Sequence, residues 1–355
     1  MISTAKFQAK KILIVKLRAI GDVLLSTIVL KSLRSAYPQS TIDFLTEIPS
    51  KDVLEGNSCV DAVLVFDSKI QSSLSLLRMI RRQDYDMVID LFGNPRSAII
   101  TLISGARVRV GYRLKWRRHC YNVVVEPRGG LVHNTQFNLD ALKELGIPIV
   151  EESLSFPIED EDRKVANDFF RQRGLDESFV VALNPGGGWY TKRWPLGRFA
   201  ELGDRLVSTC NAKVIVLWGP GEQQSAEEIV SMMTQPAILI PPTSLKQLGA
   251  ILERTSVMVT NDSGPMHIAS VLGTPVVAIF GPTIPELQGP VGTKSIIVRN
   301  TKLLCLGCNY TSCPIGTPCM KELLVDDVYR EFQRLCKIHS LLPSDYYEKA
   351  TSEAG

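Results

Sequence analysis

Hydrophobic positions in the first half of the chain alternate between short aliphatic runs and longer segments with apolar residues at helical spacing. Such runs are typical of buried strands, and the longer segments are typical of helices. We expect strands at 11–17, 41–46, 62–66 and 87–91, and helices at about 23–36, 71–82 and 95–104. Strands that alternate with helices in this way predict a parallel sheet covered on both faces.

The second half of the chain repeats this pattern. Strands are expected at 179–184, 213–218, 257–261 and 275–281, with amphipathic helices at 196–209 and 244–255. A polar, helix-forming stretch at 158–174 separates the halves. We therefore expect an α/β fold of two Rossmann-like domains facing across a cleft, at 1–172 and 173–325. Residues 326–355 are expected to form a helix that packs back on the N-terminal domain, followed by a tail.

Composition is that of a globular protein, with 45% hydrophobic and 22% charged residues. No apolar run approaches the roughly 18 residues that a membrane-spanning helix needs. The N-terminal segment lacks the apolar stretch and cleavage site of a secretory signal. We therefore expect a cytoplasmic location.

Charge is distributed unevenly between the halves. Residues 1–150 contain 21 Lys and Arg against 13 Asp and Glu, a net of +8, which leaves −5 for the remainder of a chain whose total is +3. The basic half should attract an anionic partner, such as an acidic membrane surface or a phosphorylated saccharide, unless it is simply a solvated face. No nucleic-acid-binding motif accompanies the cations, so nucleic acid is not an expected partner.

The segment "LRAIGDVLLST" (17–27) places a Gly-Asp pair where the first strand gives way to a helix. In an open α/β sheet, ligands bind at this strand-to-helix corner. Asp is also a favoured residue at helix starts, so Asp22 either caps the helix or takes part in chemistry.

"LNPGGGWYTKRWP" (183–195) follows a predicted strand directly. The glycines Gly186, Gly187 and Gly188 allow a ligand to approach the backbone, and their N–H groups can bind an anion. The following Lys192 adds a positive charge, so the segment predicts a phosphate site. Its spacing matches neither a P-loop nor a dinucleotide fingerprint.

"TNDSGPMHIASVLGTPVVAIFGPT" (260–283) predicts a strand, a turn, a short helix and a second strand. Ser263 is a candidate helix cap, and the N–H groups after it, from Gly264 onwards, suit a diphosphate. Asp262 would repel phosphate and is expected to accept hydrogen bonds from sugar or ribose hydroxyls. His267 is either a ligand-binding residue or an ordinary histidine within the helix.

Two further segments leave alternatives open. Glu222, after the turn "WGPG", could accept bonds from ribose hydroxyls or favour the start of a helix. The cysteine-rich segment "CLGCNYTSCPIGTPC" could bind a structural zinc or iron ion, form disulfides, or hold reduced thiols that pack a loop. Cytoplasmic residence disfavours disulfides. The residues concerned are Cys305, Cys308, Cys313 and Cys319.

Together these segments resemble the lipopolysaccharide heptosyltransferases of glycosyltransferase family 9. The resemblance spans about residues 11–335 and is carried, in family order, by "KILIVKLRAIGDVLLST", "DLFGNPRSAIITLISGARVRVGYR", "NPGGGWYTKRWPLGRFAELGDRL", "NDSGPMHIASVLGTPVVAIFGPT" and the cysteine segment. It implies the two-domain GT-B architecture, with acceptor saccharide in the N-terminal domain and ADP-heptose in the C-terminal domain. It also implies inverting transfer to the inner core, close to the members that add a later heptose.

Site residues follow from the resemblance position by position. It implies that Asp22 is the general base, that Lys192 contacts phosphate and that Glu222 lies near ribose. The family's Asp-x-Gly-x-x-His signature falls on 262–267, at the donor site. Some members have a Thr-Thr pair where this chain has its glycines, so its donor contacts should rely more on backbone N–H groups.

Partners and cofactors complete the expectation. Candidate contacts for an anionic lipopolysaccharide acceptor are Arg18, Arg113 and Arg117. We expect peripheral association with the inner face of the cytoplasmic membrane and no obligatory metal cofactor, because no Asp-x-Asp motif is present. One alternative is a family member that uses another nucleotide-sugar as donor. Another is a member that uses an autotransporter protein as acceptor, as in a subgroup with a four-cysteine iron site. A Rossmann-type NAD enzyme and a non-catalytic nucleotide-binding module are more distant alternatives.

Overall fold

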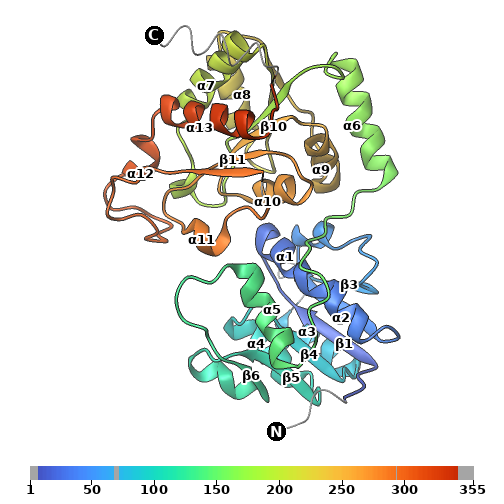
Figure 1. Cartoon of the computed structure of the whole chain (residues 1–355). Helices are drawn as coiled ribbons and strands as arrows, with labels where there is room; N and C mark the ends of the chain where they lie inside the picture. The colour runs from blue at the N-terminus through green and yellow to red at the C-terminus, as the bar shows by residue number, and fades with distance from the viewer. Residues whose placement is uncertain (1–6, 68–71, 293, 343–355) are drawn as a thin grey trace. The chain divides into compact units, whose positions relative to one another are not determined.

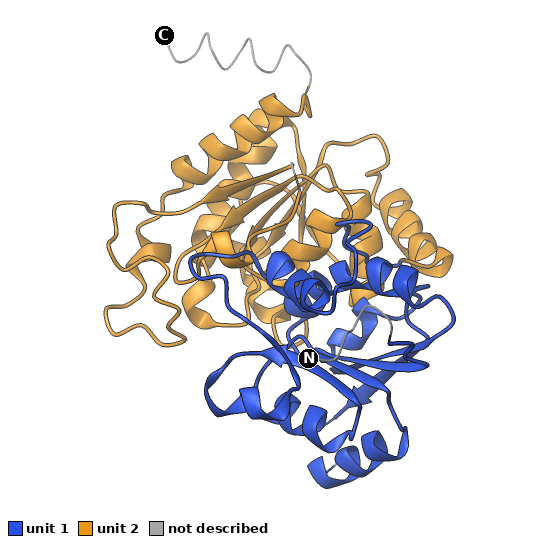
Figure 2. Ribbon diagram, turned by 60° about the horizontal axis from the view of Figure 1, so that its bottom comes forward, with its two compact units in different colours: residues 1–157 blue, residues 158–355 orange. Residues whose placement is uncertain are grey.

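The computed structural model describes residues 7–67, 72–292 and 294–342, and the chain divides into two compact units (Figure 2). Unit 1 comprises Met1–Pro157 and unit 2 comprises Ile158–Gly355. The division precedes the expected boundary at 172/173. The reason is that α6 (Asp160–Gln172) packs against α9 (Leu245–Glu253), which places the helix expected at the end of the first domain in unit 2.

Unit 1 contains a six-stranded sheet in which all neighbouring strands are parallel (Figure 1). The strands, in spatial order, are β3 (Ala62–Phe66), β2 (Thr41–Glu47), β1 (Lys11–Val15), β4 (Met87–Asp90), β5 (Val108–Tyr112) and β6 (Val123–Val125). The helices are α1 (Ile20–Ser26), α2 (Leu30–Ala36), α3 (Ser73–Arg82), α4 (Pro95–Ile103) and α5 (Asn134–Glu144), with 3₁₀ turns η2 (Thr27–Val29), η3 (Ser50–Val53) and η4 (Lys115–Cys120).

Unit 2 repeats this architecture with a second six-stranded parallel sheet. Its strands, in spatial order, are β12 (Ser295–Val298), β11 (Val276–Ile279), β10 (Val257–Asn261), β7 (Val180–Asn184), β8 (Lys213–Val216) and β9 (Ala237–Leu239). Besides α6 and α9, its helices are α7 (Leu196–Cys210), α8 (Gln223–Met232), α10 (Gly264–Val271), α11 (Pro285–Gln288), α12 (Pro318–Lys321) and α13 (Val325–Ile338), with the 3₁₀ turn η5 (Tyr190–Lys192).

Both sheets reverse strand order beside their first strand, so each has a topological switch point between two central strands. In unit 1 this point lies between β1 and β4, where Val15 pairs with Asp90. In unit 2 it lies between β7 and β10, where Asn184 pairs with Thr260. Open parallel sheets bind their ligands at such switch points. The chemistry-bearing residues of each unit should therefore be sought there.

Helix α13 differs from the expectation that it packs on the N-terminal domain. It contacts β12, β11 and α7 of unit 2. Val328, Phe332 and Leu335 lie on one face and are fully buried in the core of that unit. The apolar stripe recognised in the sequence thus covers the second sheet.

None of the helices in the described residues is both long enough and apolar enough to cross a membrane.

Candidate active-site residues in the two units

The Gly-Asp corner of unit 1 lies where β1 gives way to α1. Asp22 occupies the third position of α1 and is half-buried. Its carboxylate accepts a hydrogen bond from the backbone N–H of Ala19 at 3.3 Å, which satisfies a donor at the helix start. Asp22 therefore caps the helix while remaining partly accessible, so capping and a chemical role are compatible.

A buried lysine, Lys16, lies beside this corner, and sequence reasoning missed it. It is only 7% exposed, and its ammonium group donates to the Leu91 carbonyl at 2.9 Å. Burial lowers the pKa of Lys16, while the negative charges of Asp22 and Asp90 oppose this shift. The one signal was a lysine within the otherwise aliphatic run "ILIVKL".

Asp90, at the end of β4, is fully buried. Its carboxylate accepts bonds from the N–H groups of Phe92 and Gly93, both at 2.9 Å, and from the hydroxyls of Ser97 at 2.8 Å and Tyr121 at 2.7 Å. Burial raises the pKa of Asp90, and these four donors act against the rise. The carboxylate thereby connects the loop after β4, the start of α4 and Tyr121, which directly follows η4.

The candidate acceptor cations differ in their surroundings. Arg18 is exposed beside the corner. Arg113 is exposed and bonds Glu126 through its Nε at 2.6 Å, which raises the pKa of the guanidinium. Arg117 is half-buried and donates to the Leu114 carbonyl at 3.4 Å within its own turn.

In unit 2, the glycine loop follows β7 and is held by Glu222. The Glu222 carboxylate accepts bonds from the N–H groups of Gly187 and Gly219, both at 3.2 Å. A Cβ atom on Gly186 would lie 2.5 Å from a Glu222 oxygen, so a side chain there would displace the carboxylate from its present position. The Gly187 N–H and the Glu222 carboxylate are thus bonded to each other, while Gly188 is exposed.

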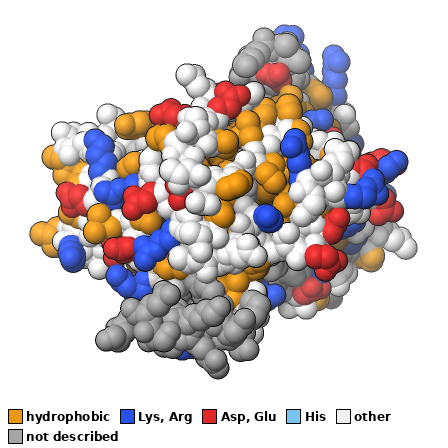
Figure 3. All heavy atoms as spheres, turned by 90° about the horizontal axis from the view of Figure 1, so that it is seen from above, with side chains coloured by type: hydrophobic (Ala, Val, Ile, Leu, Met, Phe, Trp, Pro, Cys, Tyr) orange, Lys and Arg blue, Asp and Glu red, His pale blue; other side chains and the backbone are white. Residues whose placement is uncertain are grey.

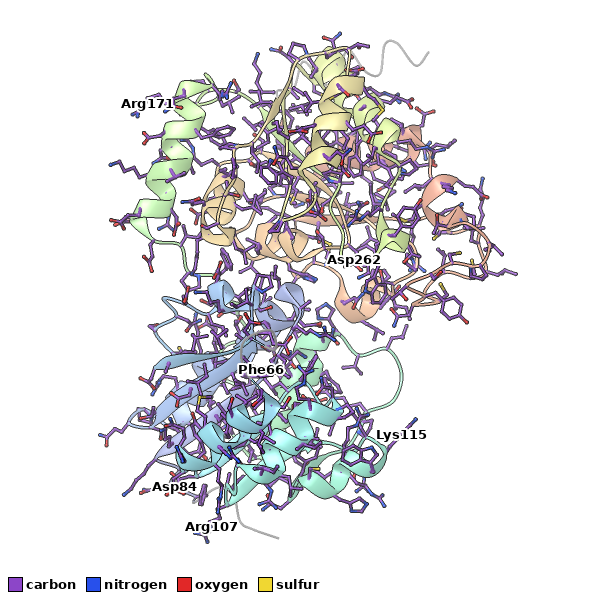
Figure 4. The ribbon with its side chains drawn as sticks, turned by 180° about the vertical axis from the view of Figure 1, so that it is seen from behind. Phe66, Asp84, Arg107, Lys115, Arg171 and Asp262 are labelled. Carbon is purple, nitrogen blue, oxygen red and sulfur yellow. The ribbon has the colours of Figure 1, made fainter. Side chains whose placement is uncertain are left out.

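Lys192 and Asp262 form an ion pair with an N–O distance of 2.8 Å, and their side chains are only 14% and 6% exposed. Asp262, labelled in Figure 4, also accepts bonds from Thr283 at 2.7 Å and Gln288 at 3.2 Å. The lysine expected at phosphate and the aspartate expected at hydroxyls are therefore in direct contact. The Lys192 ammonium also lies 4.5 Å from the centre of the Trp189 ring.

Helix α10 begins beside these residues. Ser263 is its cap and accepts a bond from the Met266 N–H at 3.4 Å, as expected, and Gly264 is the first helical residue. His267 is only 5% exposed within this helix. Asn184, at the end of β7, donates to Ser263 at 2.9 Å and so ties the two central strands together. Sequence analysis did not single out Asn184.

The segment after the glycine loop is anchored in the core. The Asn261 amide donates to the Pro185 carbonyl at 2.8 Å and accepts a bond from the Trp194 N–H at 3.1 Å. Trp194 is 1% exposed, and its indole N–H donates to the Leu323 carbonyl at 2.9 Å. The loop that carries Lys192 is thus fixed at both ends.

The four cysteines of the segment at 305–319 differ in their exposure. Cys305 is exposed, Cys308 and Cys313 are half-buried, and Cys319 is buried, with its pKa raised by burial to about 11. Across residues 7–67, 72–292 and 294–342, no three His, Cys, Asp or Glu side chains are grouped so as to hold a metal ion. The described residues therefore give no support to a zinc or iron site at this segment.

A family model described as glycosyltransferase family 9 (heptosyltransferase) matches residues 73–317. The chain belongs to glycosyltransferase family 9. The resemblance recognised in the sequence is thereby confirmed, and the protein is a glycosyltransferase of the heptosyltransferase family. The lysine–aspartate pair and the glycine loop both lie within the matched residues.

Relatives of known function support heptose transfer to lipopolysaccharide in the broad sense. Lipopolysaccharide heptosyltransferase 3 of Escherichia coli is 26% identical over 282 residues, which cover 74% of this chain and 81% of the relative. Lipopolysaccharide heptosyltransferase 2 of Salmonella typhimurium is 25% identical over 311 residues, 81% of this chain and 88% of the relative.

Solved structures confirm the α/β fold of two Rossmann-like units that characterises GT-B enzymes. A glycosyltransferase family 9 protein from Veillonella parvula has a TM-score of 0.80 at 26% identity and covers 92% of this chain and 97% of its own. The Escherichia coli heptosyltransferase WaaC, solved with ADP, has a TM-score of 0.71 at 19% identity and covers 92% of this chain and 99% of its own.

Proposed function

We propose that this protein is an inverting glycosyltransferase that moves heptose from ADP-heptose to the inner core of lipopolysaccharide, and that it resembles heptosyltransferases 2 and 3 in this. The observation that carries the proposal is the combination of family membership with the cationic glycine loop at the switch point of unit 2. Two family relatives carry these heptosyltransferase names, and a solved neighbour binds ADP. A specific donor and acceptor follow from this combination.

The donor diphosphate is assigned to the switch point of unit 2. The ammonium of Lys192, the N–H groups of the glycine loop and the start of α10 offer positive charge there. Lys192 is paired with Asp262, so on donor binding the ammonium group of Lys192 would turn partly from this carboxylate to the phosphate. Glu222 would likewise exchange its bond with Gly187 for ribose hydroxyls, and His267 would line the same site.

The general base is assigned to Asp22. In the reaction, the acceptor oxygen forms a bond to the anomeric carbon, and the bond from that carbon to the ADP oxygen breaks with its electron pair. A sugar hydroxyl is a far weaker acid than an aspartic acid with a reference pKa of about 3.9, so the proton would pass to Asp22 late in the step. Negative charge that develops on the diphosphate would be stabilised by Lys192 and the glycine loop.

The acceptor is assigned to unit 1 because of its net positive charge, with Arg18 as the exposed cation beside the corner. Arg113 and Arg117 would contribute only after giving up their present partners. An anionic inner core fits these charges. The inner core is carried on a lipid, so peripheral association with the inner face of the cytoplasmic membrane is part of the proposal.

The test of the base replaces Asp22 by Asn. We expect turnover to fall by about 10²- to 10⁴-fold, the usual scale for loss of a general base, while calorimetry shows unchanged ADP affinity. Asp84→Asn makes the same change at an exposed position of unit 1 and should be silent. Near-normal turnover of Asp22→Asn would leave that residue with helix capping alone.

The test of donor and acceptor uses ADP-, UDP- and GDP-linked sugars with defined core acceptors. Transfer only from ADP-heptose to a core acceptor supports the proposal. Transfer from another nucleotide, or only to an autotransporter protein, would refute it. Metal analysis of protein purified without chelator tests the cysteine segment: about one iron or zinc ion per chain would assign it a metal, and a ratio near zero would end that idea.

A further inference from the structure

Helix α4 exposes a stripe of aliphatic side chains. Ile99, Leu102 and Ile103 are 40%, 47% and 40% exposed and recur at the spacing of one helix face. The opposite face, with Ala98 and Thr101, is buried. A helix on the surface of a globular unit ordinarily presents polar residues outward. The outward aliphatic stripe therefore calls for an apolar or amphipathic partner.

The neighbouring elements extend this stripe. The turn η4 packs against α4, with Ala98 and Cys120 in a shared buried cluster, and its Trp116 is 52% exposed. Helix α3 also packs against α4 and carries Leu74, which is 56% exposed. We call the outward surfaces of α3, α4 and η4 the α4 face.

Cations surround the apolar residues of the α4 face. Residues 91–125, which include α4 and η4, contain seven Lys and Arg and no Asp or Glu. Helix α3 adds arginines, of which Arg81 donates to the Ser104 carbonyl at 3.1 Å, directly at the end of α4. Lys115 and Arg107 point outward from unit 1 in Figure 4. The face drawn in Figure 3, by contrast, mixes both signs of charge.

We propose that the α4 face binds the surface of an anionic phospholipid bilayer. Aliphatic and tryptophan side chains enter the boundary between headgroups and acyl chains, and cations around them are attracted to anionic headgroups. A saccharide or nucleic-acid surface would use the cations but would leave the aliphatic stripe without a role. Two of the seven cations in 91–125 are paired with carboxylates from outside the segment, Arg96 with Glu47 and Arg113 with Glu126. The other five leave the segment with a net positive charge, which favours a negatively charged partner.

The proposal deepens the proposed function, since a lipid-borne acceptor requires the enzyme to work at a membrane. A docked α4 face would hold unit 1, to which the acceptor is assigned, at the bilayer surface. Binding to vesicles and transfer to a lipid-free core oligosaccharide can be measured separately. A failure of one is therefore distinguishable from a failure of the other.

The experiment measures cosedimentation of the full chain with vesicles of phosphatidylcholine, with and without phosphatidylglycerol. We expect binding only when phosphatidylglycerol is present and at least about tenfold weaker binding at 0.5 M salt than at 0.1 M. One variant replaces Ile99, Leu102 and Ile103 by Ser, and a second replaces Arg78, Arg82 and Lys115 by Gln. Both should lose about tenfold or more in vesicle affinity.

Matched controls make the same changes outside the α4 face. Leu304→Ser and Met232→Ser remove exposed apolar side chains of unit 2, and Lys302→Gln removes an exposed cation there. These should bind vesicles like the wild type. The proposal is overturned if the wild type does not bind anionic vesicles or if either α4-face variant binds them normally. It is also overturned if the variants lose transfer to a lipid-free acceptor by the same factor as they lose vesicle affinity.

Discussion

Replacing Lys192 by Met breaks the ion pair at the switch point of unit 2 and leaves the Asp262 carboxylate almost fully buried. Removing one partner of a buried pair costs about 3–5 kcal/mol. Asp262 keeps its bonds from Thr283 and Gln288, and Lys192 retains 14% exposure, so we expect the lower end of that range. Lys302→Met, at an exposed position of the same unit, should change stability by less than about 0.5 kcal/mol.

The reciprocal variant, Asp262→Asn, should cost less, about 1–2 kcal/mol, because the long lysine side chain can turn its ammonium group toward water. If the two residues interact directly, the double variant should be more stable than the sum of the single changes predicts, by about 1–3 kcal/mol. The same lysine change should weaken ADP binding.

Urea unfolding followed by tryptophan fluorescence provides the measurement. Trp189, Trp194 and Trp218 lie in unit 2, whereas Trp116 lies in unit 1, so the signal mainly reports the unit that is changed. A two-unit chain can unfold in two steps, and the steps should be fitted separately. An unchanged midpoint for Lys192→Met, or strict additivity in the double variant, would show that the pair contributes nothing to stability.

Three further outcomes follow from buried groups. Tyr121→Phe removes a hydrogen-bond donor from Asp90, whose pKa is raised by burial. A carboxyl group with a raised pKa in the folded state lowers the free energy of unfolding as the pH rises, and loss of the donor strengthens this effect. The variant should therefore be nearly as stable as the wild type at acid pH and less stable by about 1–3 kcal/mol at neutral pH, measured by urea unfolding. A deficit that shrinks with rising pH would contradict this assignment. Gly111→Ala places a Cβ within 2.3 Å of the Tyr121 ring and should cost about 1–3 kcal/mol, measured in the same way, whereas a neutral result would mean that the ring moves freely. Burial raises the pKa of Cys336 to about 12, so mass-spectrometric mapping should find Cys336 unlabelled by iodoacetamide in folded protein at pH 7 and labelled after unfolding.

The alternation of strands and helices was predictable from the sequence because long elements carry their own periodicity. The strands β1, β2, β3 and β4, and helices such as α7 and α13, lie within a few residues of the predicted ranges. Four strands, β5, β6, β9 and β12, were not predicted. Of these, β6 (Val123–Val125) and β9 (Ala237–Leu239) have three residues each, too few to display a period. The partner of α13 was also not predictable, because an apolar stripe identifies a buried face and not the sheet that covers it.

The sequence indicated individual candidate residues of the site but not which of them contact one another. Lys192 and Asp262 are separated by 70 positions, and their contact arises only because β7 and β10 are neighbours in the sheet. The same applies to Glu222 and Gly187, which meet because β8 lies on the other side of β7. Buried Lys16 was concealed within a strand pattern that ordinarily indicates core.

These contacts share a physical feature, which is that each cation of the candidate site is paired with a carboxylate. Lys192 is paired with Asp262, and Arg193 lies 3.5 Å from Glu222. A buried unpaired cation would be costly, so the carboxylates stabilise unit 2 without ligand. If the diphosphate binds Lys192, as proposed, it must compete with Asp262 for the ammonium group. This competition weakens the binding of any ligand that brings no hydrogen-bond donor for the Asp262 carboxylate. Sugar and ribose hydroxyls are such donors, because they can bond the carboxylates that phosphate displaces. On the proposed assignment, an intact nucleotide-sugar would therefore be favoured over inorganic diphosphate by the ion pair of Lys192 and Asp262.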